Sequence, residues 1–131
     1  MNLTIAHKGL AKKIASEAVI TSVDSGKSVK VAAIWDTGAT TSLINDKIVQ
    51  DLQLKEISIA HVRHVAGTAA FPVYLAAIEI QGGMKIKEHR LVSFPPIHAF
   101  DMIIGMDIIT FGQFSIKNTN GNSIFSFTCG S

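Results

Sequence analysis

One short stretch, residues 32–42, constrains the fold of this chain more than any other. It reads Ala-Ala-Ile-Trp-Asp-Thr-Gly-Ala-Thr-Thr-Ser, so an apolar run typical of a buried strand stops abruptly on Asp36-Thr37-Gly38. A glycine in such a turn lets the backbone approach another segment closely or take a positive φ. The pattern therefore predicts an aspartate held on a tight turn at the end of a core strand.

The rest of the chain alternates between short strand-like runs and turn signals, which is typical of an all-β protein. Asn45 or Asp46 is expected to cap a short helix that ends near residue 52, and a second short helix is expected over residues 106–111. Strands are expected at residues 3–7, 17–23, 29–35, 42–44, 56–65, 71–80, 84–94, 100–104, 114–116 and 124–127.

Length and composition narrow the class of protein. With 131 residues, 47% of them hydrophobic and 17% charged, the chain is expected to form a single domain over residues 1–131. A net charge of +2 without a run of basic residues argues against nucleic-acid binding. No stretch approaches the roughly 18 to 20 apolar residues of a membrane span. With no apolar signal segment in residues 1–10 and one cysteine, Cys129, a cytoplasmic location is expected.

A second apolar element, Ile103-Ile104-Gly105, lies 67 residues after Asp36, counted to Ile103, and opens the second expected helix. Together with the Ala-Thr-Thr-Ser continuation of the first motif, it resembles the retroviral-type aspartic proteases (retropepsins). These carry two apolar residues and a glycine behind their catalytic loop. The resemblance covers roughly residues 15–127 and implies a small, partly open all-β barrel with one or two short helices. Its flap would be the hairpin over residues 65–73.

The resemblance also implies roles around the aspartate. Asp36 would be the catalytic carboxylate, and the hydroxyl of Thr37 would bond the loop of a partner subunit. Gly38 would leave room for the substrate backbone. Ala39, Thr40 and the residues up to Ser42 would line the entrance to a substrate subsite.

Two further groups of residues receive roles from the same resemblance. Gly67 and Thr68 would lie at the tip of the flap, which closes over the substrate and excludes water. Ile103, Ile104 and Gly105 would support the catalytic loop from the core without taking part in the chemistry. No metal, cofactor or covalent intermediate is implied.

The chemistry requires a second copy of the chain. Two carboxylates about 3 Å apart share one proton, so that one activates water as a base while the other polarises the carbonyl as an acid. The aspartic proteases are themselves the standard instance of this effect. The chain contains one Asp-Thr-Gly. An Asp-Ser-Gly also occurs, Asp24-Ser25-Gly26, but it is expected to form the turn between the strands at residues 17–23 and 29–35, and 131 residues are too few for two catalytic lobes. A protease built from it must therefore be a two-fold homodimer with Asp36 of each copy at the axis, acting on extended peptides with apolar side chains.

Two positions depart from the retroviral pattern. Retroviral enzymes often carry an acidic residue directly after Asp-Thr-Gly-Ala and an arginine directly after the apolar-apolar-Gly element, and these two residues pair. Here the positions hold Thr40 and Met106. Because both charges are absent together, neither is left buried without a partner. This favours a cellular variant whose dimer contacts differ from the viral ones. Trp35, bulkier than usual, is expected to pack in the core.

Other polar residues have simpler interpretations. Asp107 is expected to cap the second helix or to form an ion pair at its first turn, and Asp101 is not expected to be a second catalytic carboxylate. Ser42 has no His/Asp arrangement that would indicate a serine hydrolase. Four histidines raise a zinc site as an alternative, but without cysteines nearby they are expected to be surface residues: His61, His64, His89 and His98.

Two classes of function without catalysis stay open. A peptide-binding or dimerisation module can keep the protease fold without turnover, because one fold hosts several functions. Against this, such a module has no need to place two repelling carboxylates at a dimer axis. A structural interaction protein would form dimers that are indifferent to the loss of Asp36. A separate, purely structural interpretation of Asp36-Thr37-Gly38 is a turn residue that caps the region of residues 40–44.

Overall fold

The computed structural model describes residues 1–95 and 99–130, which form ten β-strands and two short helices. The all-β architecture expected from the sequence is confirmed. In chain order the elements are β1 (Asn2–His7), β2 (Ala15–Thr21), β3 (Ser28–Trp35), β4 (Leu43–Asn45), α1 (Asp46–Leu52), β5 (Glu56–His64), β6 (Gly67–Ile80), β7 (Met84–Phe94), β8 (Met102–Ile104), α2 (Met106–Ile109), β9 (Gln113–Thr119) and β10 (Asn122–Thr128).

Seven strands form one mixed sheet in the spatial order β2-β3-β8-β4-β7-β6-β5. An additional antiparallel pairing joins β2 to β6, so the strands from β2 to β6 close into a ring and β5 lies outside it. The small barrel that was expected is confirmed, and it is closed rather than partly open. The closure comes from residues 18–21 of β2 pairing with residues 77–80 of β6, a long-range contact that neither strand's own pattern reveals.

The barrel interior is filled by aliphatic side chains that alternate along the strands, as the two-residue period of a strand requires. In β6, Ile78 and Ile80 are almost completely buried, whereas Glu79 between them is exposed. Ile44 of β4 and Ile104 of β8 are fully buried on the strands that flank the Asp36 turn. Each such side chain contributes about 1.5–3 kcal/mol to folding, so this turn rests on a well-packed base.

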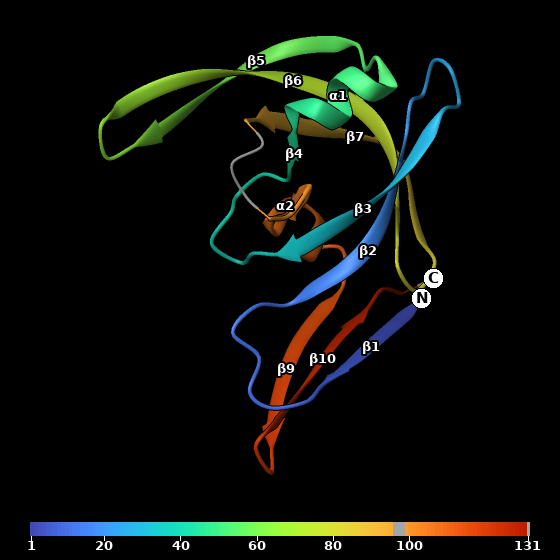
Figure 1. The fold of residues 1–131 in the computed structure, drawn as a ribbon, viewed down its shortest axis with the longest axis vertical. Helices are drawn as coiled ribbons and strands as arrows, with labels where there is room; N and C mark the ends of the chain where they lie inside the picture. The colour runs from blue at the N-terminus through green and yellow to red at the C-terminus, as the bar shows by residue number, and fades with distance from the viewer. Residues whose placement is uncertain (96–98, 131) are drawn as a thin grey trace.

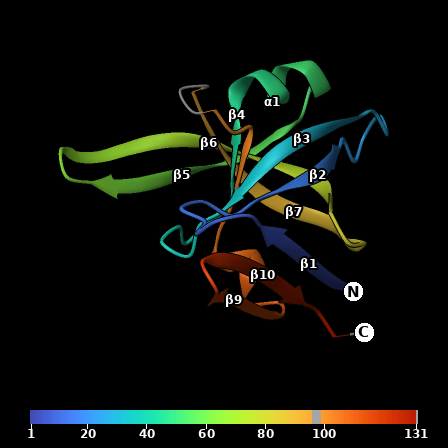
Figure 2. The same ribbon diagram turned by 60° about the horizontal axis from the view of Figure 1, so that its bottom comes forward.

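The remaining three strands form a separate antiparallel sheet in the order β1-β10-β9. Asn2 near the start of the chain lies opposite Thr128 near its end, and Figure 2 shows both ends together at this sheet. Trp35 at the end of β3 packs its ring against Phe125 and Phe127, with centroids 5.0 and 4.9 Å away. The expected core role of Trp35 is confirmed, and the ring ties this sheet to the strand that leads to Asp36.

Helix α1 begins as the sequence predicts. The side-chain oxygen of Asn45 accepts a hydrogen bond from the backbone N–H of Ile48 at 3.0 Å, which satisfies one of the free donors at the helix start. Asn45, rather than Asp46, is therefore the N-cap. The helix buries Ile48, Val49 and Leu52 against the barrel.

Strands β5 and β6 form a long hairpin that extends away from the barrel, at the upper left of Figure 1. His64 pairs with Gly67, so the turn consists of Val65 and Ala66. The hairpin expected at residues 65–73 is thus the end of a longer one that spans β5 and β6. Gly67 and Thr68 start β6 just beyond the turn rather than forming its tip.

Candidate active site

Asp36 directly follows β3 and opens the Asp36 loop, defined as residues 36–42, which leads into β4. Its backbone N–H donates to the carbonyl oxygen of Ile104 at 2.9 Å, continuing the parallel pairing of β3 with β8. Its carboxylate Oδ1 accepts from the N–H of Gly38 at 2.8 Å. The side chain is exposed, so the end of a buried strand presents a carboxylate to solvent.

The Asp36–Gly38 bond is the interaction that a purely structural aspartate would make, since aspartates often organise their own turn. It occupies Oδ1 alone. Within residues 1–95 and 99–130, Oδ2 of Asp36 has no hydrogen-bond partner. The turn therefore fixes the orientation of the carboxylate and leaves one oxygen available to a ligand.

Gly105 lies directly behind the loop, where a side chain does not fit. A Cβ atom at this position would lie 2.8 Å from the carbonyl oxygen of Ala39 and 2.9 Å from the carbonyl carbon of Thr41. The next residue, Met106, donates its backbone N–H to the same Ala39 oxygen at 2.8 Å. This close backbone approach explains why a glycine follows Ile103 and Ile104.

Ser42, at the other end of the loop, is held by a buried polar cluster. Its hydroxyl donates to Oδ1 of Asp107 at 2.6 Å and accepts from the N–H of Gly105 at 3.0 Å. Its own N–H donates to Oδ2 of Asp107 at 3.0 Å, and Nε2 of His89 lies 2.9 Å from that oxygen. The cluster links the loop to α2 and to β7.

The charge of Asp107 is stabilised by these partners. Burial raises the pKa of this carboxyl, but hydrogen bonds from His89 and from the hydroxyl and N–H of Ser42 outweigh it, so the pKa lies below its ordinary 3.8. The carboxylate is therefore ionised at neutral pH and accepts all three contacts. Only a quarter of its side chain and 13% of that of His89 are exposed.

The cluster corrects several expectations. Asp107 does not cap α2, whose N-cap Gly105 has no side-chain hydrogen bond. It contacts His89 instead, and this contact is the expected ion pair when His89 is protonated. His89 is largely buried rather than a surface residue. Ser42 is fully buried and lines no subsite entrance. A His/Asp pair does surround Ser42, yet the aspartate lies between serine and histidine, which is not the order of a serine hydrolase.

The other residues singled out by the sequence take simple positions. Ile104 is fully buried and Ile103 is half-buried behind the loop, as support residues would be. Ala39 is half-buried. The remaining members of the set are exposed: Thr37, Gly38, Thr40, Gly67 and Thr68.

The β5–β6 hairpin lies on the same side of the molecule as the Asp36 loop in both Figure 1 and Figure 2. One face of the hairpin is apolar, because the strand register sets Ala60 opposite Phe71 and Val62 opposite Ala69. Val73, next on that face, is buried against the barrel. The hairpin thus carries an apolar strip outward from the core.

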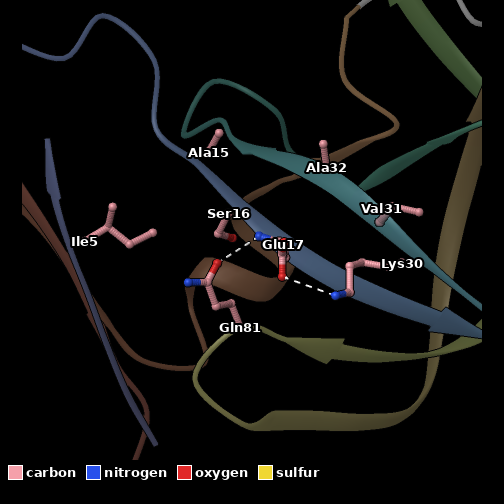
Figure 3. Close-up of a pocket in the computed structure, with 8 residues that line it drawn as sticks. All are labelled: Ile5, Ala15, Ser16, Glu17, Lys30, Val31, Ala32 and Gln81. Atoms are coloured by element: carbon pink, nitrogen blue, oxygen red, sulfur yellow. Dashed lines mark hydrogen bonds and ion pairs between the residues drawn. The ribbon is translucent and has the colours of Figure 1, made fainter.

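Three cavities are relevant to ligand binding. One of about 390 Å³ includes Asp36 and Thr37. Another of about 640 Å³ lies between the base of the hairpin and the polar cluster, and is lined by Thr41, Ile57, Leu75, Glu88, His89, Arg90 and Asp107. The third, about 520 Å³, lies between the two sheets and contains no residue of the Asp36 loop. Figure 3 shows the residues that line it, among which Glu17 pairs with Lys30.

No group of three or more His, Cys, Asp or Glu side chains within the described residues is arranged to hold a metal ion. His61 is exposed on β5. The side chain of His64 and the whole of His98 lie outside the described part of the chain. Among the described residues, no helix is long and apolar enough to cross a membrane.

His89 is the residue of this region whose role the sequence did not reveal, because it was considered only as a zinc ligand or a surface residue. Its contact with Asp107 joins positions 18 residues apart, and Ser42 lies 65 residues from the same carboxylate. One signal was available: Asp107 is an acid within an otherwise apolar run from Met102 to Ile109. A buried acid needs partners, but the sequence does not say which residues supply them.

Comparison with known families matches most of the chain. The family model described as "gag-polyprotein putative aspartyl protease" matches residues 15–110, a span that includes the Asp36 loop, His89 and Gly105. No curated protein sequence matches this chain significantly.

Solved structures share the fold. The retropepsin-like aspartic protease of Rickettsia conorii is 13% identical over 99% of this chain and 95% of that chain, with a TM-score of 0.61. The EIAV protease complexed with the inhibitor HBY-793 is 21% identical over 77% of this chain and 88% of that one, with a TM-score of 0.57. The simian foamy virus protease is 21% identical over 75% and 93%, with a TM-score of 0.54. These likenesses establish a retropepsin-like fold.

Proposed function

The chain belongs to the gag-polyprotein aspartyl protease family, and from this premise we propose that it is an aspartic endopeptidase that acts as a homodimer. The observation that carries the proposal is the exposed carboxylate of Asp36, fixed at the end of a buried strand with Oδ2 available. Gly105 and the Ser42 cluster support the loop behind it, which is what a precisely placed catalytic group requires.

Each copy supplies one carboxylate to the reaction. With Asp36 of two copies about 3 Å apart, one proton is shared between them. The ionised carboxylate takes a proton from a water molecule, whose oxygen attacks the carbonyl carbon of the peptide bond. The protonated carboxyl polarises the carbonyl oxygen. Collapse of the tetrahedral intermediate breaks the C–N bond, and the amine leaves with a proton.

The substrate class follows from the hairpin. Its apolar strip, which includes Phe71 and Val62, suits a peptide segment with apolar side chains beside the bond that is cut. Backbone groups of an extended peptide pair well with strands. The peptide would lie between the Asp36 loop and the β5–β6 hairpin. It would contact Thr37, Gly38, Ala39 and Thr40 of the loop, and Gly67 and Thr68 of the hairpin.

A non-catalytic peptide-binding or dimerisation module is the alternative, and one observation favours it: the Asp36–Gly38 hydrogen bond gives the aspartate a structural use. The two functions differ in one respect. A binding module would keep its peptide affinity and its dimer after Asp36→Asn, and the wild-type protein would not cut the peptides that it binds.

The deciding experiment is cleavage of a diverse peptide library between about pH 4 and pH 7, comparing wild-type protein with Asp36→Asn at the same dimer fraction. We expect cuts by the wild type, and a loss of at least about 100-fold in the variant, because an amide cannot act as the base. Asp51→Asn, the same change at an exposed aspartate of α1, serves as a matched control and should still cut. A confirmed wild-type dimer that cuts nothing would refute the proposal.

A further inference from the structure

The imidazole of His89 keeps one of its two ring nitrogens available to a ligand. Nε2 lies 2.9 Å from Oδ2 of Asp107, whereas Nδ1 has no hydrogen-bond partner among the described residues. The side chain is 13% exposed, and no side-chain nitrogen or oxygen in the described part of the chain is both fully buried and unpartnered. The free nitrogen of this largely buried ring therefore reaches solvent.

The contact with Asp107 decides the chemistry of that free nitrogen. Because Asp107 is ionised at neutral pH, its oxygens only accept, so Nε2 carries the proton that makes the 2.9 Å contact. In a neutral ring Nδ1 is then a hydrogen-bond acceptor, and in a protonated ring it becomes a donor. The same atom offers opposite chemistry to a ligand in the two charge states.

The cavity that His89 lines is placed to receive a side chain of the substrate. This hairpin-base cavity, the one of about 640 Å³, is bounded by Thr41 of the Asp36 loop and by Ile57 and Leu75 of the hairpin. A peptide held between the loop and the hairpin passes its mouth. The two aliphatic walls suit the apolar stem of a side chain, and His89 contributes a polar atom for its end.

The charges around this cavity do not favour an ionised side chain. Those that surround His89 are Asp107 of α2 and, on β7 itself, Glu88 and Arg90, whereas the lining from β5, β6 and the Asp36 loop carries no charge. Glu88 and Arg90 have no ion-pair partner among the described residues. A carboxylate would meet Glu88 and Asp107, and an ammonium group would meet Arg90. An uncharged amide, which both donates and accepts, matches this mixed lining.

We propose that His89 is a specificity-determining residue whose Nδ1 binds the end of a substrate side chain in the hairpin-base cavity: a glutamine amide while the ring is neutral, and increasingly a glutamate carboxylate as the ring becomes protonated. The amide NH2 donates to Nδ1 of the neutral ring, and its carbonyl oxygen accepts from Arg90. Protonation turns Nδ1 into a donor and adds a positive charge, so a carboxylate gains the contact that the NH2 group loses. The inference rests on the proposed function, because it names a substrate class for the same peptide site.

The first test needs no variant. Starting from a peptide that the wild type cuts, each position is replaced in turn by Gln, Glu and Leu, and kcat/KM is measured at about pH 7.5 and about pH 5.5. A peptide glutamate, with an ordinary pKa of about 4.3, is ionised at both. The ratio between two peptides at one pH cancels the pH dependence of the Asp36 pair itself.

We expect a position at which Gln is preferred over both Glu and Leu by about 10-fold at the higher pH, the size of one hydrogen bond. The Gln/Glu ratio at that position should fall by about 5-fold or more at the lower pH, where histidines are largely protonated. The absence of such a position, or a ratio that is the same at both pH values, would overturn the inference.

The variant His89→Gln assigns the preference to the ring. Its amide keeps an N–H donor for Asp107 but provides no second nitrogen and no titrating charge. The Gln preference and its pH dependence should both disappear. A histidine with a purely structural role would lower the cleavage of all three peptides by the same factor and leave their ratios unchanged, which would contradict the inference. The matched control is His7→Gln, an exposed histidine of β1, which should keep the wild-type ratios.

Peptide binding separates this inference from the proposed function. Fluorescence anisotropy measures the affinity of Asp36→Asn protein, with and without His89→Gln, for Gln and Glu versions of a library peptide that it binds. If the wild type cuts no peptide but a Gln preference in binding depends on His89, the inference stands and the protease proposal fails. If the wild type cuts through Asp36 and His89→Gln changes no ratio, the protease proposal stands and the inference fails. A protein that binds no peptide refutes both.

Discussion

The two ends of the Asp36 loop are built differently. At its last residue, Ser42 is fully buried, and its N–H and hydroxyl bind Asp107 at 3.0 and 2.6 Å. At its first residue, Asp36 is exposed, and its side chain makes one hydrogen bond, to Gly38 within the same turn. A single chain thus provides all the packing that holds the loop at Ser42, while the carboxylate of Asp36 at the other end faces solvent.

This difference shows which part of the site a single copy can complete. The buried end needs nothing further, since every hydrogen bond there is made within the chain. The exposed end holds one carboxylate and lies beside a cavity that is also lined by Phe114 and Ile116 of β9, and Ile116 is 45% exposed. A rigid base under an incomplete catalytic centre is the arrangement expected of half a dimeric site.

The largest difference between the two ends of the loop is expected when the glycine at each end, Gly105 or Gly38, is replaced by alanine and the loss of stability is compared. Gly105→Ala forces a Cβ to within 2.8 Å of the Ala39 carbonyl oxygen, a backbone atom that Met106 also holds, so we expect a loss of about 3 kcal/mol in unfolding free energy. At Gly38 the added Cβ meets only Oδ1 of Asp36, at 3.2 Å. Gly38→Ala should therefore change stability by about 0.5 kcal/mol or less.

Urea unfolding of both variants measures this difference. Equal losses for the two glycines would mean that the buried end is no more tightly packed than the exposed end.

Replacing the central carboxylate of the buried cluster should have a smaller effect. Asp107→Asn keeps the shape but replaces one acceptor oxygen with a donor, so one of the contacts from Ser42 or His89 weakens. We expect a loss of about 1 to 2 kcal/mol in unfolding free energy at neutral pH. The control is Asp51→Asn on the exposed face of α1, which should have almost no effect.

The effect of Asp107→Asn should also depend on pH. Because the pKa of Asp107 is lower in the folded protein than its ordinary 3.8, the ionised carboxylate stabilises the fold fully above that value. This contribution is lost as the pH falls through the folded pKa. The stability difference between wild type and Asp107→Asn should therefore be largest near neutral pH and shrink below about pH 4. A difference that grows on acidification would contradict the assigned hydrogen bonds.

Local patterns in the sequence were enough to locate Asp36 and the glycine that packs behind its loop. An apolar strand that stops on Asp36, and a glycine behind two isoleucines, are both features of short stretches. The same holds for Asn45, whose capping bond to Ile48 spans three residues.

Contacts between distant segments could not be predicted in the same way. His89 meets Asp107 through a side-chain contact that no periodicity encodes, and β2 closes the barrel by pairing with β6. The tip of the hairpin was misplaced by two residues because Gly67, with its φ of 132°, starts a strand rather than forming the turn. Glycine signals a turn region in sequence, but the register that decides its position is set by the whole strand pair.

The central claim is that one exposed Asp36 is half of a catalytic pair, and subunit mixing tests it most directly. Wild-type protein at a fixed concentration is titrated with increasing Asp36→Asn protein, and cleavage of a peptide from the library is followed while native mass spectrometry confirms mixed dimers. Because each mixed dimer holds one carboxylate, activity should fall towards zero as the variant captures wild-type subunits. Activity that stays constant while mixed dimers accumulate would show that Asp36 acts within a single copy, and would contradict the claim.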